Sequence, residues 1–415
     1  MVAMVAERRV AIVTGANAGV GYAIVQRLVQ ESTEPLTVIL ACRNKQRAQK
    51  ALASLQAYFE EHQQKHLTQN KDKSAEALKE SSPMTTKEGR LYHQPDLKVE
   101  LVDVGSVSSV LAFNQRIKDQ YRNVDYLFCN AGVLPSVGVM WGKVVLDCFR
   151  APMDLVVRAD VLIQPKQHLT EDGIGNVFAS NVFGHYLMIK GLEDQLSKTE
   201  DDPGRVIWTS SLTAEKASFR IADWQGLEAV QPYESSKWVT DLLSLRLNEI
   251  WSSQQPSGVS SALSDKAVSP PSSGRRVTRS LSKSAIANGI NPDTTGAVHS
   301  KKNIISITTQ PGVVASGIGG LAPWIVKLRI GLHYVLRICG EYHQTVTGYH
   351  GAHANVFAAL KQPIGEIDCW SKYGSCITRT GKEYLKVEKI VEYDESQAKM
   401  VVEELEKLRL SFVSS

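Results

Sequence analysis

The sequence predicts an α/β fold, a doubly wound parallel sheet in a single domain with long insertions. Three observations support this fold: short β-branched apolar runs, helix-prone stretches between them, and a glycine-rich turn after the first run. Strands that are buried on both faces of a parallel sheet give near-continuous apolar runs. Their alternation with helices is typical of βαβ units.

Six strands and, between and after them, five helices are expected in the sheet-forming part of the chain. The strands cover residues 8–15, 37–43, 97–104, 124–132, 205–211 and 303–312. The helices cover about 20–30, 44–63, 106–121, 174–192 and 233–251. A domain of this class needs roughly 250 residues, so the rest of residues 1–415 is assigned to insertions. These span about 64–95, 133–172 and 252–302, and the Ser-, Pro- and Arg-rich composition of the last predicts disorder.

Composition excludes several classes of protein. With 43% hydrophobic and 22% charged residues in 415, the chain is neither disordered nor fibrous. A net charge of +4 is too small to indicate nucleic-acid binding. The six cysteines show neither zinc spacing nor a disulfide framework, and no metal site is expected. The first residues lack the apolar core of a secretory signal, so we expect an intracellular protein.

The turn after the first strand is expected to bind a dinucleotide. Its sequence is TGANAGVG, with glycines at Gly15, Gly19 and Gly21 and with Asn17 and Val20 between them. Glycine lets the backbone turn sharply and approach a pyrophosphate, whose charge is favoured at the N-terminus of the next helix. An ordinary strand-to-helix turn is the alternative.

The ends of the second and third strands predict which dinucleotide binds. No Asp or Glu ends the second strand to hydrogen-bond a ribose 2′-hydroxyl. Arg43 and Arg47 instead offer guanidinium groups suited to a 2′-phosphate, so the expected cofactor is NADPH. The alternative is a solvated basic helix start. Asp103, at the end of the third strand, either accepts a hydrogen bond from the adenine or caps the local chain.

Tyr233 and Lys237 form the candidate catalytic pair. Residues four apart on a helix share a face, so the ammonium group can sit beside the phenol. A neighbouring positive charge lowers a tyrosine pKa that is ordinarily near ~10. Such a tyrosine can exchange a proton with a carbonyl or an alcohol near neutral pH. The pair follows the fifth strand, which ends in Ser210 and Ser211.

Taken together and in this order, the motifs resemble those of the short-chain dehydrogenase/reductases. The resemblance covers most of residues 8–320 outside the insertions and implies a Rossmann-type fold. It implies that Ser211 orients a carbonyl, with Ser210 as the alternative because the interval to Tyr233 is longer than usual, and that Asn181 holds a proton-relay water. The further cofactor-binding residues that it implies are Asn130, Ala131, Gly132, Pro311, Gly312, Val314 and Ser316.

A narrower similarity is to the fungal 3-ketosteroid reductases of sterol C-4 demethylation. It rests on VTGANAGVG, FASNVFGHYLMIK, YESSK, TTQPGVV and the late KYGSCITRTGKEYLK. It implies NADPH-dependent reduction of a 3-keto sterol to a 3β-hydroxy sterol in ergosterol synthesis. The implied place is the cytoplasmic face of the endoplasmic reticulum or of a lipid droplet, beside other C-4 demethylation enzymes. A reductase of another apolar ketone (17β-hydroxysteroid or retinoid type) and a silent NADPH-binding scaffold are the alternatives.

Residues 318–340 indicate a lipid partner independently of the resemblance. A helix starting near Pro323 gathers on one face Trp324, Leu328, Leu332, Val335, Leu336 and Cys339, and on the other Arg329, His333 and Arg337. A basic amphipathic helix can lie in a membrane interface, but its charges make it a poor spanning helix. It can also act as a lid on the active site. The fold further implies a homodimer through the helices of Asn181 and Tyr233.

Overall fold

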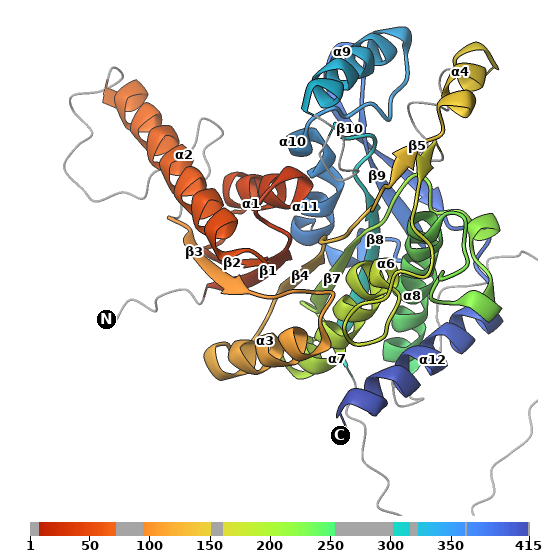
Figure 1. Cartoon of the computed structure of the whole chain (residues 1–415). Coiled ribbons are helices and arrows are strands. Elements are labelled where there is room, and N and C mark those ends of the chain that lie inside the picture. The colour runs from red at the N-terminus through yellow and green to blue at the C-terminus, as the bar shows by residue number, and fades with distance from the viewer. Residues whose placement is uncertain are drawn as a thin grey trace, which may run out of the picture.

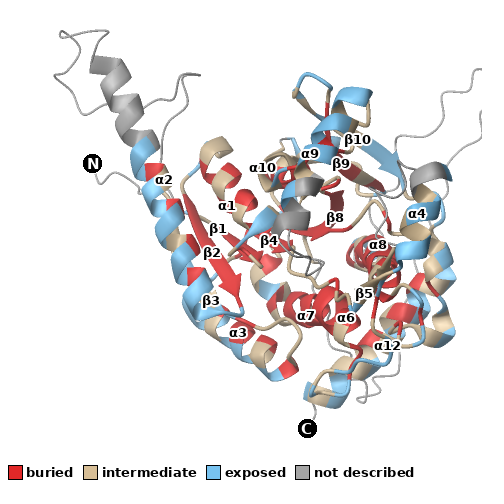
Figure 2. Cartoon of the chain, turned by 45° about the horizontal axis from the view of Figure 1, so that its top comes forward, coloured by how far each residue is buried: buried red, intermediate tan, exposed pale blue. Residues whose placement is uncertain are grey.

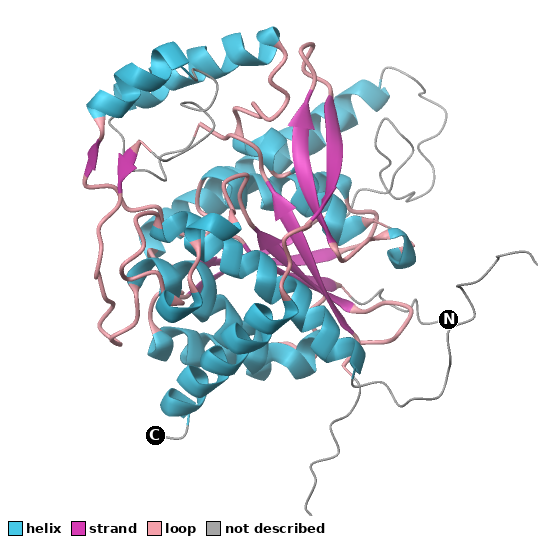
Figure 3. Ribbon diagram, turned by 90° about the vertical axis from the view of Figure 1, so that its right-hand side faces the viewer, coloured by secondary structure: helices cyan, strands magenta, loops and turns pink. Residues whose placement is uncertain are grey.

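The architecture is a single large sheet with helices on both faces. A computed structural model describes residues 8–71, 94–150, 161–253, 302–315, 323–361 and 363–413. Its eight strands lie in the order β10-β9-β8-β7-β4-β1-β2-β3. All neighbours pair in parallel except β10, which runs antiparallel to β9 at one edge. Figures 1 and 3 show the helical layers on either side, which confirms the doubly wound α/β fold.

The expected elements all form, and further ones follow them. The strands are β1 (Arg9–Thr14), β2 (Leu36–Cys42), β3 (Asp96–Leu101), β4 (Tyr126–Cys129), β5 (Gly138–Val139), β6 (Leu162–Ile163), β7 (Gly204–Thr209), β8 (Ile304–Gln310), β9 (Ser371–Ile377) and β10 (Glu383–Lys389). The helices are α1 (Gly19–Glu31), α2 (Lys45–Lys71), α3 (Val107–Gln120), α4 (Trp141–Arg150), α6 (Asn176–Phe178), α7 (Gly184–Leu196), α8 (Pro232–Ser253), α9 (Pro323–Cys339), α10 (Gly348–Gly351), α11 (His353–Leu360) and α12 (Glu395–Val413). The strands β9 and β10 and the helix α12 were not predicted from the sequence.

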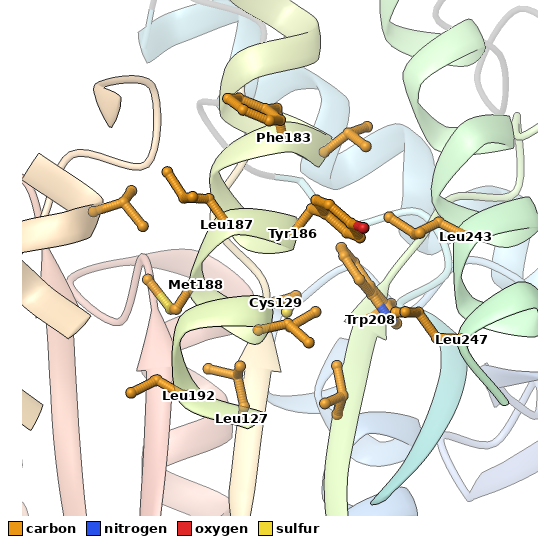
Figure 4. Close-up of a cluster of buried hydrophobic side chains, with 14 of the residues drawn as sticks. Leu127, Cys129, Phe183, Tyr186, Leu187, Met188, Leu192, Trp208, Leu243 and Leu247 are labelled. Carbon is orange, nitrogen blue, oxygen red and sulfur yellow. The ribbon is translucent and has the colours of Figure 1, made fainter. Parts of the chain in front are cut away.

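Alternate residues of each central strand enter one of two apolar cores. In β4, Leu127 and Cys129 pack into the core beneath α3, α7 and α8, whereas Tyr126 and Phe128 pack into the core beneath α1 and α2. Figure 4 shows the first core, where Trp208 of β7 lies between the side chains of α7 and α8. Figure 2 shows that the central strands and the inner helix faces form the buried interior, whereas the edge strands β3 and β10 are more exposed. The sheet is therefore a rigid platform for the loops at its strand ends.

Two of the three predicted insertions lie largely outside the described residues. Residues 64–71 extend α2, and the described part of that segment resumes at 94. Of 252–302, only the two ends are described. The excursion at 133–172 contains the β5–β6 pair and α4. Its residues 151–160 lie outside the described part.

The C-terminal helix α12 packs against α8, the helix that carries Tyr233. Its Ala398, Val401 and Leu405 are buried in the core. The phenol of Tyr186 on α7 donates a 2.5 Å hydrogen bond to Glu406. Part of the surface through which a homodimer was expected is therefore covered by the chain itself.

Candidate active site

The strand order reverses direction between β1 and β4. From β1 the chain builds outward to β3 and then returns to place β4 on the other side of β1. In open α/β sheets, ligands bind outside the carboxyl ends of the strands at such a switch point. The turn after β1 and the loop after β4, both predicted to bind a cofactor, meet there.

The turn after β1 has the backbone that the sequence predicted. Gly15 and Gly19 have φ of +68° and +57°, a region that favours glycine. A Cβ on Gly21 would lie 2.4 Å from the Gly15 carbonyl oxygen, whereas one on Gly19 would meet nothing within 4 Å. The α1 helix starts at Gly19, and Ala18 offers no side chain to cap its first N–H groups. The turn therefore fits a pyrophosphate, with an open backbone and uncapped donors.

The end of β2 presents two exposed guanidinium groups. Arg43 and Arg47 are both exposed, and the Asn44 side chain caps the start of α2 by accepting a 2.9 Å hydrogen bond from the Arg47 N–H. Arg43 Nη1 lies 3.6 Å from the Asp103 carboxylate. Asp103 also accepts a 2.9 Å hydrogen bond from Gly105 N–H, so it caps its own loop. The adenine contact of Asp103 stays a prediction.

The loop after β4 is tied to β1 through Thr14. The Thr14 hydroxyl accepts hydrogen bonds of 2.9 Å from the N–H groups of Asn130 and Ala131. The Asn130 amide in turn donates to the Thr14 carbonyl at 2.9 Å. The structure thus gives Asn130 a scaffolding role between the two loops. Sequence reasoning missed Thr14, which stands inside the glycine motif itself.

The segment after β8 makes a sharp turn at Pro311–Gly312. Gly312 has φ of +69°, and a Cβ there would come within 2.6 Å of the His343 carbonyl oxygen. Val314 then forms an isolated parallel bridge with Val346. These contacts hold the segment at the carboxyl end of β8. Ser316, the last predicted cofactor contact, lies outside the described residues.

Ser211, Tyr233 and Lys237 come together where β7 ends and α8 begins. The Ser211 hydroxyl lies close enough to the Tyr233 phenol to oppose the rise in its pKa, and it hydrogen-bonds the Thr213 hydroxyl at 3.0 Å. Lys237 Nζ lies 5.6 Å from the centre of the Tyr233 ring and donates a 2.8 Å hydrogen bond to the Thr209 carbonyl. Ser210, the alternative, is buried, and its hydroxyl makes no hydrogen bond to any described residue. The geometry therefore places Ser211 beside the phenol.

Asn181 lies in a π-helical turn, Ala179–Phe183, that leads into α7. Its amide donates to the Val133 carbonyl at 3.1 Å and to the Ser236 hydroxyl at 2.9 Å, and its oxygen accepts from Val133 N–H at 2.7 Å. Insertions of this kind are frequent at functional sites. Asn181 thereby joins the loop after β4 to the catalytic helix.

A buried glutamine, which the sequence analysis did not single out, supports Tyr233. Gln164 follows β6 and is 5% exposed. Its Oε1 accepts a 2.9 Å hydrogen bond from Tyr233 N–H, and its Nε2 donates to Glu234 at 2.8 Å. Because N–H groups in the first turn of a helix lack partners within it, Gln164 caps the catalytic helix from a distant segment. No local sequence signal marks this role.

The Tyr233 pKa is raised rather than lowered as predicted, because the nearby charge of Lys237 does not outweigh burial. Burial and the neighbouring Glu234 carboxylate raise the Tyr233 pKa to about 12, against a smaller opposing effect of the Ser211 hydrogen bond. Burial also lowers the pKa of Lys237 to about 8. The ammonium group hydrogen-bonds the Thr209 carbonyl rather than the phenol, which explains its weak effect.

Comparison with known proteins agrees with this fold and site. A solved structure of an uncharacterized protein from Mycobacterium Paratuberculosis shares the fold with a TM-score of 0.51 and 15% identity, over 97% of this chain and 93% of that one. No protein-family model matches the chain. The sheet and the order of the motifs along the chain agree with the predicted resemblance to the short-chain dehydrogenase/reductases.

The sequence relatives are named 3-keto-steroid reductases. The 3-keto-steroid reductase/17-beta-hydroxysteroid dehydrogenase 7 of Rattus norvegicus is 27% identical over 94% of this chain and 92% of its own length. The human protein of that name is 32% identical over 60% of this chain and 62% of its own length. The 3-keto-steroid reductase of Saccharomyces cerevisiae is 25% identical over 92% of this chain and 90% of its own. The chain is therefore similar to fungal and to animal 3-keto-steroid reductases along most of its length.

Proposed function

We propose that this chain is an NADPH-dependent reductase that converts a 3-keto sterol to the 3β-hydroxy sterol during C-4 demethylation in ergosterol biosynthesis. The observation that carries the proposal is the meeting of the Ser211 hydroxyl, the Tyr233 phenol and Lys237 beside Gly132 in the loop after β4. The names of the relatives support the sterol as substrate.

The cofactor would be held by groups from three strand ends. The turn at Gly15–Gly21 would bind the pyrophosphate, and Arg43 and Arg47 would bind the 2′-phosphate. The loops after β4 and β8, with Ala131, Gly132, Gly312 and Val314, would line the nicotinamide. Bound NADPH would supply the hydride that reduces the ketone carbon.

The side chains around Tyr233 bind and protonate the oxygen of the ketone. The hydroxyls of Ser211 and Tyr233 donate hydrogen bonds to it and stabilise the negative charge that develops there. With a pKa of about 12, Tyr233 keeps its proton at neutral pH and can transfer it to a more basic alkoxide. Lys237, still largely charged at neutral pH, stabilises the phenolate that remains.

A panel of ketones tests the substrate against the two alternatives. Purified protein in detergent micelles is given NADPH with a 3-keto sterol, a 17-keto steroid or a retinal, and NADPH oxidation is followed. We expect the highest kcat/KM for the 3-keto sterol. A higher value for another ketone would move the assignment to that substrate class. NADPH that binds but is oxidised with none of them would favour the scaffold.

A membrane surface is the second part of the proposal. On α9, Leu332, Val335 and Ile338 are 43%, 56% and 66% exposed. The expected basic face is corrected at His333, which is fully buried and lies 2.6 Å from Gln344 Oε1. In the described half of α9, the apolar face therefore points to solvent, which is unlike a lid packed on the sheet. No helix among the described residues is long and apolar enough to cross a bilayer.

A second helix adds to the same surface. On α4, Trp141, Val145 and Leu146 are 67%, 59% and 45% exposed. The α4 and α9 helices follow the carboxyl ends of β4 and β8, and both lie at the top of the molecule in Figures 1 and 3. Exposed apolar helix faces of this kind can lie in a membrane interface. We propose that they rest on the cytoplasmic face of the endoplasmic reticulum or of a lipid droplet, where other C-4 demethylation enzymes would be partners.

Flotation with phospholipid vesicles tests this surface. We expect the variant V335E/I338E to lose most vesicle binding, because two charges would enter the apolar layer. The matched control is V391E, at a position 85% exposed that lies before α12. Equal flotation of both variants would contradict the proposed surface.

A further inference from the structure

A largely buried ion pair lies one helical turn beyond Lys237. Asp241 on α8 is 1% exposed, and its Oδ2 lies 2.5 Å from Nζ of Lys372. Lys372 belongs to β9, in the KYGS segment that the reductase chemistry described above does not use. Removing two charges from water costs several kcal/mol per ion unless the surrounding geometry compensates for it. The contacts of the pair show what it holds in place.

The pair connects three elements of the active site. Lys372 Nζ donates a 3.2 Å hydrogen bond to the main-chain carbonyl of Ser211. One turn before Asp241 on the same helix, Lys237 Nζ donates a 2.8 Å hydrogen bond to the Thr209 carbonyl. The residues that leave β7 are thus fastened to the catalytic helix on one side and to β9 on the other. The Ser211 side chain, which acts on the Tyr233 pKa, belongs to this fastened segment.

Asp241 and Lys372 are also the charged groups that act on Lys237. Four elements of the described chain place titratable groups near Lys237. They are α8 with Tyr233 and Asp241, β9 with Lys372, β4 with Cys129, and α7 with His185. Burial raises the Cys129 pKa well above its usual value and lowers the His185 pKa to about 3, so both are neutral near pH 7. Tyr233 is neutral as well. Asp241 raises and Lys372 lowers the pKa of Lys237.

We propose that Asp241 and Lys372 are positioning residues of the reductase: their buried pair holds the Ser211 main chain and the Lys237 ammonium group in register with the Tyr233 phenol. The inference rests on the proposed function. It gives the KYGS segment a role in catalysis through Lys372, although that residue lies far along the chain from the catalytic motif.

A purely structural role makes a different prediction. Replacing both partners of a buried ion pair is often neutral for stability, whereas removing one is costly. If the pair served stability alone, single variants would lower the melting temperature and would leave the ionisation of Lys237 unchanged. The test therefore needs a measurement that stability does not affect.

The experiment compares D241N, K372M and the double variant D241N/K372M with the wild type. The pH dependence of kcat/KM is measured with NADPH and a 3-keto sterol. In the same proteins without ligands, NMR of ¹³C-labelled lysine follows the titration of Lys237, whose signal is assigned with K237R. Thermal unfolding is recorded for each variant.

Opposite shifts in the two single variants are expected. Asp241→Asn leaves Lys372 to repel Lys237, so the Lys237 titration and the alkaline limb of kcat/KM move to lower pH by about one unit. Lys372→Met moves both to higher pH and lowers kcat about tenfold, because Ser211 loses its anchor. The double variant loses both the attraction of Asp241 and the repulsion of Lys372 on Lys237. The alkaline limb of its kcat/KM profile therefore returns toward that of the wild type, while kcat stays low.

An unchanged Lys237 titration in both single variants, with losses only in melting temperature, would overturn the proposal. If one single variant does not fold, the double variant decides: wild-type kcat in it would also overturn the proposal. A wild type that reduces no 3-keto sterol would refute the substrate assignment instead. The NMR titrations, which need no substrate, would then still test how the pair acts on Lys237.

Discussion

The two halves of the site are built in different ways. On the β1–β3 side, the main chain forms the binding surface: a turn with two left-handed glycines and the uncapped start of α1. On the β7–β10 side, side chains from distant segments hold the catalytic groups in place. Gln164 and Asp241 contact the helix that carries Tyr233 or belong to it, and Lys372 contacts the strand end that carries Ser211. The local sequence therefore indicates the residues of the cofactor side, whereas only the folded chain shows which residues support the catalytic side.

The largest effect on the cofactor half is expected from R43A/R47A. Hydrogen bonds to charged groups are worth about 1.5–3 kcal/mol each, less when exposed. We expect NADPH affinity to fall by about 10- to 100-fold while NADH affinity stays the same. Binding is measured by quenching of protein fluorescence, with R122A, at another exposed arginine, as control. An equal loss for both dinucleotides would show that the pair does not contact the 2′-phosphate.

On the catalytic half, Gln164→Leu is expected to lower kcat about tenfold. The substitution leaves the Tyr233 N–H without its acceptor, and an unpaired buried donor costs about 1–3 kcal/mol. The phenol would then be less well fixed, while NADPH affinity should hold. Steady-state kinetics are compared with those of Gln115→Leu, whose amide lies on the exposed surface of α3. Identical kcat for the two variants would exclude the capping role.

The pH dependence of reduction is a third prediction. Below pH 8, Lys237 is protonated and supports the Tyr233 phenolate; above it, the charge and the rate decrease together. We expect the alkaline limb of kcat/KM near pH 8 rather than near pH 12, where Tyr233 itself titrates. Lys237→Arg should move this limb upward, since arginine keeps its charge. If the alkaline limb does not move in that variant, a group other than Lys237 must titrate there.

The smallest effect is expected from Gly19→Ala. A Cβ there meets no atom within 4 Å, so the cost is the strain of φ +57°, on the order of 1 kcal/mol. Gly142→Ala in α4 is the control, because it also meets open space and has no positive φ. Urea unfolding should show a loss only for Gly19→Ala. Equal stability of the two variants would argue against a strained turn.

The sequence predicted the elements whose signals are local. The six strands, the glycine turn and the spacing of Tyr233 and Lys237 follow from short-range periodicity and backbone chemistry. The pKa of Tyr233 was predicted with the wrong sign, because spacing on a helix does not show that burial and Glu234 outweigh a lysine turned toward Thr209.

The rest depends on contacts between distant segments. The strand β10 and the helix α12 were not predicted. They follow the sixth predicted strand, where the expected alternation of strands and helices was taken to end. His333 was placed on a solvated basic face, but its partner Gln344 lies in a loop that only tertiary structure brings close. Gln164 likewise acts on a helix about seventy residues further along the chain.

The central claim is that Tyr233 donates the proton in a ketone reduction driven by NADPH. The most direct measurement is NADPH oxidation with a 3-keto sterol by the wild type, Tyr233→Phe and the control Tyr384→Phe on β10, with NADPH affinity measured for each. Loss of a general acid predicts a decrease in kcat of about 10²- to 10⁴-fold for Tyr233→Phe, with NADPH binding kept and the control unchanged. Turnover by Tyr233→Phe at the wild-type rate would contradict the account.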